Sequence, residues 1–472
     1  MAGGTSQELY QARIPIYPRS VKGRFRTIKW VILALAYGVY FLLPWLRWER
    51  AVGIPQAVAF DIEGRRFYIF DLVVHAQDIF WLAGFLVVAA LLLFFVTGIA
   101  GRVFCGYFCF QTLWTDVYVL IERLVQGERP ARIRLDKQPW NAEKIAKKLL
   151  THVLWLLVGF WTGLTFTLYW GDAPQLFVAF FSGDAPFPAY ATTLFLTLTT
   201  YVMAGLAREQ VCTYMCPYAR FQGAMFDRDT LIVAYDEKRG EGEAGRHKIA
   251  RGFKSREDRE VEGAGDCIDC GYCVQVCPTG IDIRNGMQYQ CISCALCIDA
   301  CDTIMDSLGW QRGLIKYTSE KVQCGEKTRF FKAKNIGYGA AAIGAAVALV
   351  LSVIGQVPLD FSVEQVRQPL FVQLSDGRIQ NSYEIKINNK TDRAVPFALG
   401  VEDLPGAELD LGHMEDLRLQ PEQSLRILAR VRVMPDPQQR QPREFHVVVT
   451  PQAGTDLPVL RQSAFFHQSG GH

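Results

Sequence analysis

Net charge and cysteine are both scarce in this sequence. Its 472 residues include 50 lysines and arginines against 47 aspartates and glutamates, a formal net charge of +3. This balance gives no electrostatic reason to expect a nucleic-acid partner. Thirteen cysteines in a chain of this length are too dilute for a small scaffold held together by disulfides. Half of the residues are hydrophobic and the mean hydropathy is +0.10, so the chain contains either a very large core or membrane segments.

The apolar residues are clustered rather than evenly spread. Five stretches approach or exceed the roughly 17–25 residues with which an apolar helix crosses a bilayer. The first is too long for the apolar part of a cleavable signal peptide, and no small-residue cleavage site follows it. We therefore expect a bundle of five transmembrane helices. They are Trp30–Leu46, Ile79–Ile99, Leu149–Tyr169, the threonine-containing Ala189–Ala207, and Ile336–Ile354.

The positions of lysine and arginine predict the orientation of this bundle. Fifteen of these residues lie in the N-terminal arm and in the loop after the second span, against four in the loops after the first and third spans. Short cytoplasmic loops carry the excess of such residues. The N-terminus is therefore predicted to be cytoplasmic and, after five spans, the C-terminus periplasmic. Every cysteine then lies in a cytoplasmic segment, where thiols serve as metal ligands or redox groups rather than disulfides.

This topology divides the chain into five parts. We expect a cytoplasmic N-terminal arm at 1–29, four transmembrane helices at 30–207, a cytoplasmic segment at 208–334, the fifth helix at 336–354 and a periplasmic domain at 357–472. Short β-rich runs separated by turn residues predict that the last domain is an all-β, immunoglobulin-like sandwich with a docking or support role. The runs are Leu370–Leu374, Tyr383–Ile387, Pro396–Val401, Leu425–Val433 and Glu444–Val449.

The most specific motif is a doubled cysteine run at about 262–310. Three close-spaced thiolates can hold three corners of an iron–sulfur cube, and in two-cluster bacterial ferredoxins the fourth cysteine of each run ligates the other cluster. The spacing therefore predicts an α+β ferredoxin-like domain for one-electron transfer, and it disfavours structural zinc. We expect one [4Fe–4S] cluster on Cys267, Cys270, Cys273 and Cys301, and a second on Cys291, Cys294, Cys297 and Cys277.

Two further cysteine pairs follow the second and fourth spans. They are Cys105 with Cys109, and Cys212 with Cys216. A spacing of four residues places both thiols of a pair on one face of a helix. Two such pairs at one membrane surface can form a four-thiolate site, and soft thiolates favour Cu(I), zinc or iron–sulfur; inert buried thiols are the alternative. Met215 and His152 are candidate additional ligands, and Cys324 is left without a role.

Taken in order, these motifs resemble the cytochrome c oxidase accessory protein family (FixG/RdxA/CcoG) over nearly the whole chain. The resemblance implies a protein of the bacterial inner membrane that serves haem–copper oxidase assembly as a cupric reductase, with the four membrane-edge cysteines as the copper-binding and catalytic residues. Phe110 stands where the family pattern has a proline after the first pair. The motifs are Cys105-x3-Cys109 with Gln111-Thr-Leu-Trp114-Thr-Asp116, Arg208-Glu-Gln-Val-Cys212-Thr-Tyr-Met-Cys216-Pro-Tyr-Ala-Arg-Phe-Gln222, the doubled ferredoxin run with Cys277-Pro-Thr-Gly-Ile-Asp-Ile-Arg284, and the β-rich tail.

These parts combine into one expected mechanism and two alternatives. A cytoplasmic donor reduces two [4Fe–4S] clusters, electrons pass to copper at the four thiols, and Cu(I) leaves for a copper transporter or chaperone of the oxidase assembly machinery. One alternative is a quinol-linked membrane electron-transfer protein, in which the cysteine pairs serve a path between quinone and clusters. The other is a non-enzymatic scaffold whose β-sandwich holds the oxidase.

Overall fold

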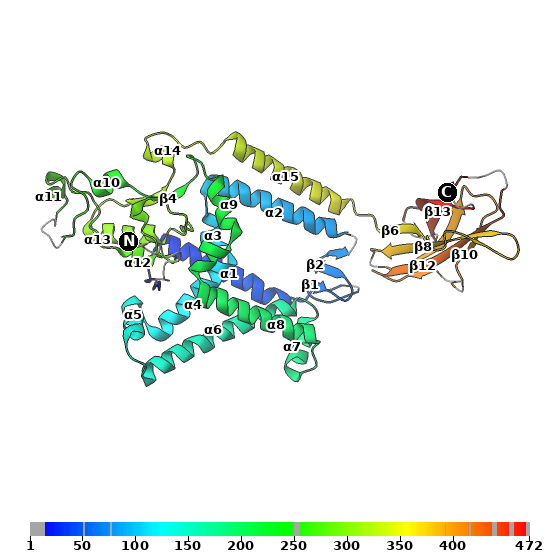
Figure 1. Cartoon of the computed structure of the whole chain (residues 1–472), viewed down its shortest axis with the longest axis horizontal. Helices are drawn as coiled ribbons and strands as arrows, with labels where there is room; N and C mark the ends of the chain where they lie inside the picture. The colour runs from blue at the N-terminus through cyan, green and yellow to red at the C-terminus, as the bar shows by residue number, and fades with distance from the viewer. Residues whose placement is uncertain are drawn as a thin grey trace, which may run out of the picture. The chain divides into compact units, whose positions relative to one another are not determined.

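The computed structural model of the chain consists of two compact units. The first comprises Met1–Trp48 with Gln56–Leu349, and the second Glu49–Pro55 with Val350–His472. Helices and the ferredoxin segment (residues 227–324) belong to the first unit, and the larger sheets belong to the second (Figure 1). The structure describes residues 15–50, 52–75, 78–249, 255–391, 393–412, 414, 417–436, 441–452 and 457–468.

Six helical segments among the described residues are long and apolar enough to cross a membrane, which identifies a multi-pass membrane protein. Five of them cover the five expected spans. The sixth, Val103–Gln126, lies where the sequence predicted a loop, so the count of five is not confirmed. The helices before the ferredoxin segment are α1 (Arg24–Leu42), η1 (Leu43–Trp45), α2 (Ile79–Ala100), α3 (Val103–Tyr107), α4 (Phe110–Gln126), α5 (Arg129–Lys137), α6 (Ala142–Leu168), α7 (Ala173–Ser182), α8 (Phe187–Thr200), the π-helical η3 (Tyr201–Ala207) and η4 (Val211–Met215), and α9 (Pro217–Met225).

The sequence did not predict the sixth segment because it contains charged residues and because its helix is interrupted between α3 and α4. Its mean hydropathy of 1.2 is the lowest of the six, since it contains acidic residues. Asp116 forms an ion pair with Lys29 at 2.8 Å, and Glu122 forms one with Arg132 at 3.0 Å. Charges inside a helix bundle are tolerated when they are paired in this way. The partners come from other segments, so a search for long apolar runs cannot find them.

Small residues and threonines hold the membrane helices together. A Cβ atom on Gly163 of α6 would lie 2.5 Å from the carbonyl oxygen of Thr193 in α8, so only glycine permits this approach of the two backbones. The hydroxyls of Thr167 and Thr193 bond to each other at 2.9 Å. On the other side of α6, the indole nitrogen of Trp114 in α4 donates to the Thr162 hydroxyl at 2.9 Å.

The ferredoxin segment combines short helices with one strand pair. β4 (Ile232–Tyr235) pairs antiparallel with β5 (Ile315–Thr318), and the cysteine runs lie between these strands in the sequence. The remaining helices of the first unit are α10 (Glu237–Glu241), α11 (Arg256–Val261), α12 (Tyr272–Val276), η6 (Ile283–Asn285), α13 (Leu296–Leu308), α14 (Glu320–Gln323) and α15 (Ala333–Ile354). A three-stranded antiparallel sheet connects α1 to α2, with β1 (Val58–Asp61), β2 (Arg66–Ile69) and β3 (Leu72–His75).

The second unit is a sandwich of two antiparallel sheets. One has the order β10-β12-β8-β6 with β7 beside β8, and the other β11-β9-β13-β14. The alternation seen in the sequence of β12 fits this arrangement, because Ile427, Ala429 and Val431 are buried between the sheets. The five expected runs fall on β7, β8, β9, β12 and β13. The strands are β6 (Leu359–Gln365), β7 (Val372–Gln373), β8 (Ile379–Asn389), β9 (Val395–Glu402), β10 (Glu408–Asp410), β11 (Arg418–Leu419), β12 (Ser424–Val433), β13 (Arg443–Pro451) and β14 (Leu460–Phe466).

Candidate redox site

The eight ferredoxin cysteines surround two separate cavities with mainly apolar walls. Each cavity takes cysteines from both runs. One is lined by Cys267, Cys270, Cys273 and Cys301, and the other by Cys277, Cys291, Cys294 and Cys297 together with Cys273. Four soft thiol donors around an apolar cavity suit a [4Fe–4S] cluster.

The backbone of the two cysteine runs repeats a left-handed pattern. Asp269 and Gly271 in the first run have φ of 49° and 66°, and Ser293 and Ala295 at the equivalent places of the second run have φ of 52° and 60°. Such conformations are costly for residues other than glycine. Their recurrence shows that both loops turn tightly around their thiols. In the second loop, the backbone N–H of Ser293 donates to the sulfur of Cys291 at 3.5 Å.

Each membrane-edge pair ends one helix and begins the next. Cys109 is the residue before α4, with φ −64° and ψ 125°, and Cys216 is the residue before α9, with φ −80° and ψ 110°. The expectation that both thiols of a pair share one helix face is therefore wrong, because the helix is interrupted between them. Phe110 begins α4 just as Pro217 begins α9, so the missing proline does not prevent this helix start.

The two pairs come together in the fold, although they are more than 100 residues apart. Burial raises the pKa of the Cys212 thiol to about 12. The nearby thiols of Cys109, Cys105 and Cys216, when charged, contribute to this rise and the charge of Arg102 opposes it, so all four thiols lie within electrostatic reach of one another. Among the described residues, no three histidine, cysteine, aspartate or glutamate side chains converge closely enough to hold a single metal ion.

The segment between Cys105 and Cys109 packs directly on the second cysteine run. A Cβ atom on Gly106 would lie 2.7 Å from the carbonyl oxygen of Ile292 and 2.9 Å from the Cα of Cys294. The hydroxyl of Tyr107 donates to the carbonyl oxygen of Cys294 at 3.1 Å. The loop that lines the second cavity and the helix that carries the membrane-edge thiols are thus in backbone contact.

A buried guanidinium connects the two thiol sites. Arg102 is 4% exposed, and its Nη1 donates to the carbonyl oxygen of Tyr289 at 2.5 Å. Its Nε donates to the Oε1 of Gln222 at 3.2 Å, and the same oxygen accepts from the sulfur of Cys105 at 3.2 Å. Burial raises the pKa of the Cys291 thiol, and the charge of Arg102 opposes that rise. One cation therefore faces a thiol of each site.

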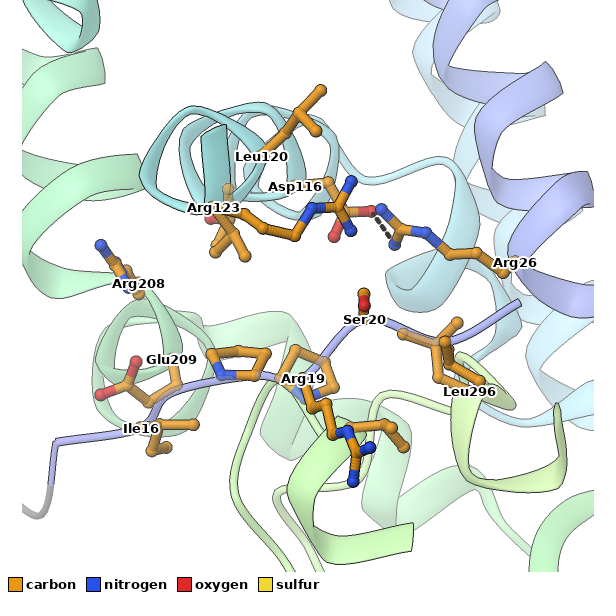
Figure 2. Close-up of a pocket in the computed structure, with 16 residues that line it drawn as sticks. Ile16, Arg19, Ser20, Arg26, Asp116, Leu120, Arg123, Arg208, Glu209 and Leu296 are labelled. Atoms are coloured by element: carbon orange, nitrogen blue, oxygen red, sulfur yellow. Dashed lines mark hydrogen bonds and ion pairs between the residues drawn. The ribbon is translucent and has the colours of Figure 1, made fainter. Parts of the chain in front are cut away.

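The N-terminal arm ties the ferredoxin segment to the membrane helices. Residues 16–20 run between α4 and the ferredoxin segment (Figure 2). The backbone N–H of Arg19 donates to the carbonyl oxygen of Gln275 at 2.8 Å, on the ferredoxin side. The hydroxyl of Ser20 donates to Glu128 at 2.8 Å, at the end of α4.

An aspartate of the ferredoxin segment caps the first membrane helix. The Asp299 carboxylate accepts from the backbone N–H groups of Phe25 at 3.2 Å and Arg26 at 2.7 Å. Gly23, the residue before α1, has no side chain to do this, and a Cβ atom there would lie 2.3 Å from Asp299. A carboxylate at the free N–H groups of a helix start is stabilising, so this contact fixes α1 against α13.

The other candidate ligands lie elsewhere. The Nδ1 of His152 is 3.0 Å from the hydroxyl of Tyr201, and its ring packs on the edge of Trp155. Met215 is exposed at the end of η4. Cys324 is exposed at the end of α14, and its nearest polar partner is Arg228 at 4.0 Å. None of the three joins the four thiols in the described structure.

Sequence reasoning gave no role to Arg102, Gln222 or Asp299. Arg102 lies three residues before Cys105, and Gln222 lies six residues after Cys216, inside the second motif that carries the family resemblance. Their closeness in the sequence to the two pairs was the available signal. Asp299 gives no such signal, because its partners lie more than 270 residues earlier in the chain.

Comparison with known proteins identifies both parts of the chain. A family model described as a 4Fe-4S dicluster domain matches residues 207–320. A second, described as the IG-like fold at the C-terminal of FixG, matches residues 349–468. Protein RdxB of Cereibacter sphaeroides is 44% identical over 86% of either chain. Protein RdxA of the same organism is 44% identical over 85% of either chain. Nitrogen fixation protein FixG of Rhizobium meliloti is 40% identical over 85% of this chain and 82% of its own.

The chain belongs to the FixG/RdxA family. The predicted family membership is therefore confirmed. This member is a multi-pass membrane protein with a 4Fe–4S ferredoxin domain and an immunoglobulin-like C-terminal domain. Its iron–sulfur domain assigns it to electron transfer.

Proposed function

We propose that this protein carries single electrons to copper at its four membrane-edge thiols and reduces Cu(II) to Cu(I) for the assembly of a haem–copper oxidase. The observation that carries the proposal is the contact of Gly106 and Tyr107 with the loop of Cys294. This contact joins the backbone of the loop that lines the second cluster cavity to the segment between Cys105 and Cys109. An electron can leave the ferredoxin segment there without crossing solvent.

The two groups of cysteines and Arg102 would have separate roles. The crossed sets Cys267, Cys270, Cys273 with Cys301, and Cys291, Cys294, Cys297 with Cys277, would hold the two [4Fe–4S] clusters, which supply one-electron transfer when bound. Copper is the substrate, and the thiolates of Cys105, Cys109, Cys212 and Cys216 would favour the softer Cu(I) product over Cu(II). Arg102 would offset the negative charge that thiolates gather on both sides of it.

We further propose that the segment with α3 and α4 enters the membrane and leaves on the same side. α4 has 17 residues, about 26 Å at 1.5 Å per residue, which is shorter than the roughly 30 Å of a bilayer core. Both ends carry arginines, Arg102 before α3 and Arg129 after α4. Five crossings then remain, with the N-terminus and the thiol sites cytoplasmic and the C-terminal domain periplasmic. Reporter fusions after residue 102 and after residue 139, which flank α3 and α4, should lie on the same side of the membrane, and opposite sides would contradict this topology.

The proposal is tested on the full-length protein in detergent. Wild type should contain about eight iron atoms per chain, as two cubane clusters require, and should produce Cu(I) from Cu(II) after reduction with dithionite and removal of its excess. Replacing the four membrane-edge cysteines by serine should abolish copper binding and Cu(I) production and leave the iron content unchanged. Cys324→Ser is the matched control, because this exposed cysteine lies away from both sites.

An iron-loaded quadruple variant that still binds copper would contradict the site assignment. A wild-type protein that binds copper but leaves it as Cu(II) would contradict the reductase. In that case the oxidase assembly role would have to rest on the C-terminal domain alone.

A further inference from the structure

A cavity of about 580 Å³ lies among the membrane helices. Its walls come from α1, α4, α6, α8 and η3. Pockets for small ligands commonly have volumes of roughly 300–1,000 Å³ and apolar, aromatic walls with a few polar groups. Here the aromatic wall includes Tyr40, Phe110 and Trp114, and the polar groups include Gln111 and Thr199.

The surroundings of this cavity select a neutral ligand that dissolves in lipid. No charged side chain is among its described lining residues, and all of them belong to segments long and apolar enough to cross a membrane. Two aromatic side chains of its wall, Phe110 and Phe195, are 68% and 65% exposed. These exposed rings face the bilayer, so a ligand would enter from the lipid rather than from water.

One buried amide gives the cavity a specific polar contact. The Nε2 of Gln111 donates to the carbonyl oxygens of Met203 at 2.8 Å and Arg208 at 3.3 Å. Among the described residues nothing bonds to its Oε1 atom, which is not one of the fully buried unpaired atoms and therefore stays accessible. An accessible amide oxygen can accept a hydrogen bond from a ligand. A lipid acyl chain could not satisfy it, whereas a ligand hydroxyl could.

Two lining residues of the cavity lie close in sequence to the membrane-edge cysteines. Gln111 lies two residues after Cys109 on the first turn of α4. Met203 lies in the π-helical η3, which leads to Cys212, and π-helical turns occur frequently at functional sites. Gln111 therefore joins α4, which follows Cys109, to η3, which precedes Cys212.

We propose that this cavity binds the ring of a lipid-soluble quinol, which is the electron donor left open by the proposed function. One quinol loses the hydrogens of its two hydroxyl groups as two protons released to water and becomes a quinone with the loss of two electrons. Two Cu(II) ions take one electron each and become two Cu(I). When bound, the clusters would exchange one electron at a time, so they would connect a two-electron donor to a one-electron acceptor. The redox step rests on the proposed function, whereas quinone binding does not.

The test uses full-length protein in nanodiscs of quinone-free phospholipid, titrated with decylubiquinone. Thr199→Phe fills the cavity, and the hydroxyl it removes bonds only within its own helix. Leu198→Phe is the matched control, because Leu198 is the neighbouring residue but does not line the cavity. Wild type and the control should bind quinone saturably at one site per chain, and Thr199→Phe should bind at least about tenfold more weakly. Gln111→Met, which removes the unpaired acceptor, should also weaken binding.

Several results would overturn the proposal. They are no saturable binding by wild type, equal affinity in Thr199→Phe, or a bound phospholipid that quinone does not displace. If quinone binds but decylubiquinol yields no Cu(I), while dithionite-reduced protein does, the donor role is overturned. If neither donor yields Cu(I), the proposed copper function fails, and saturable binding blocked by Thr199→Phe still supports the quinone site.

Discussion

The two groups of redox cysteines in this protein are built in different ways. The eight ferredoxin cysteines lie within 35 residues of sequence, on loops whose backbone turns around each cavity. The four membrane-edge cysteines come from two segments more than 100 residues apart, each interrupted so that its second cysteine begins a new helix. The first group is defined by local spacing, whereas the second exists only after the helix bundle has formed.

The two sites obtain their properties from different parts of the chain. The ferredoxin cavities are formed by the apolar side chains and tight turns of the cysteine-containing loops themselves. The membrane-edge thiols depend on neighbours from other elements, namely the Arg102 guanidinium, the Gln222 amide and the backbone of the second cysteine loop. Changes at such neighbours should alter electron transfer and copper binding without removing the clusters.

The crossing of the two ferredoxin runs is the largest effect to test. Cys301→Ala should remove the cluster of the first run, although Cys301 lies in the second run, because it lines the cavity of Cys267 and Cys270. Iron content should fall from about eight to about four atoms per chain. The electron paramagnetic resonance (EPR) spectrum of the remaining cluster should match that of Cys270→Ala. A spectrum that matches Cys294→Ala instead would show that the runs do not cross.

Copper binding should depend steeply on pH. Burial raises the pKa of Cys212 to about 12, so the free thiol is protonated at neutral pH, whereas copper binds the thiolate. Each bound proton that copper displaces lowers the apparent binding constant about tenfold for every unit by which the pH falls. Titration in weakly buffered solution should show acidification as copper binds and proton uptake when a chelator removes it. Binding that is independent of pH between 6 and 8 would contradict thiolate ligation.

The contact between α3 and the second cysteine loop should control the rate of electron transfer. Gly106→Ala places a Cβ atom 2.7 Å from the carbonyl oxygen of Ile292 and should move the two backbones apart. We expect Cu(I) formation to slow by about tenfold or more, with iron and copper content unchanged. Gly223→Ala in α9 is the control, because its Cβ atom meets nothing within 4 Å. Equal rates in the two variants would disprove this route.

The charge of Arg102 should affect both sites at once. Arg102→Gln should weaken copper binding about tenfold, or about 1.4 kcal/mol, because thiolates lose a nearby positive charge. The potential of the second cluster should fall by tens of millivolts, since about 59 mV corresponds to a tenfold change for one electron. Arg102→Lys should recover part of both effects. Arg220→Gln, at an exposed position of α9, should change neither property.

The smallest effect concerns the cap of the first membrane helix. Asp299→Ala removes the acceptor for the N–H groups of Phe25 and Arg26 and should lower the free energy of unfolding by about 1 kcal/mol. Asp299→Asn keeps an acceptor and should lose less. Thermal unfolding of the three proteins in the same detergent measures the order. An unchanged midpoint in Asp299→Ala would mean that the ferredoxin segment is held without this cap.

The local features could be predicted from the sequence. Cysteine spacing alone predicted two crossed thiol sets, because the eight cysteines lie close together in the chain. Alternation of apolar and polar residues predicted β12 and the buried face with Ile427, Ala429 and Val431. Long apolar runs predicted five membrane helices, because each run also lies within one segment of the chain. Each of these signals is complete within one short segment.

The remaining features depend on contacts between distant segments. The apolar segment with α3 and α4 was missed because Asp116 and Glu122 lower its hydropathy, and their partners lie elsewhere in the chain. The helix breaks before Phe110 and Pro217 could not be read from a four-residue spacing. The roles of Arg102 and Asp299 also depend on partners that only the folded chain brings near.

Rapid-freeze EPR of a single turnover tests directly whether electrons pass from the clusters to copper at the membrane-edge thiols. Full-length protein is reduced with dithionite, freed of excess reductant and mixed with one Cu(II) per chain. The Cu(II) signal and the signal of the reduced cluster should disappear together, one for one, in wild type and in Cys324→Ser. In the quadruple Cys105, Cys109, Cys212 and Cys216 to serine variant, the cluster should stay reduced. Cluster oxidation by Cu(II) at an equal rate in that variant would contradict electron transfer through the membrane-edge thiols.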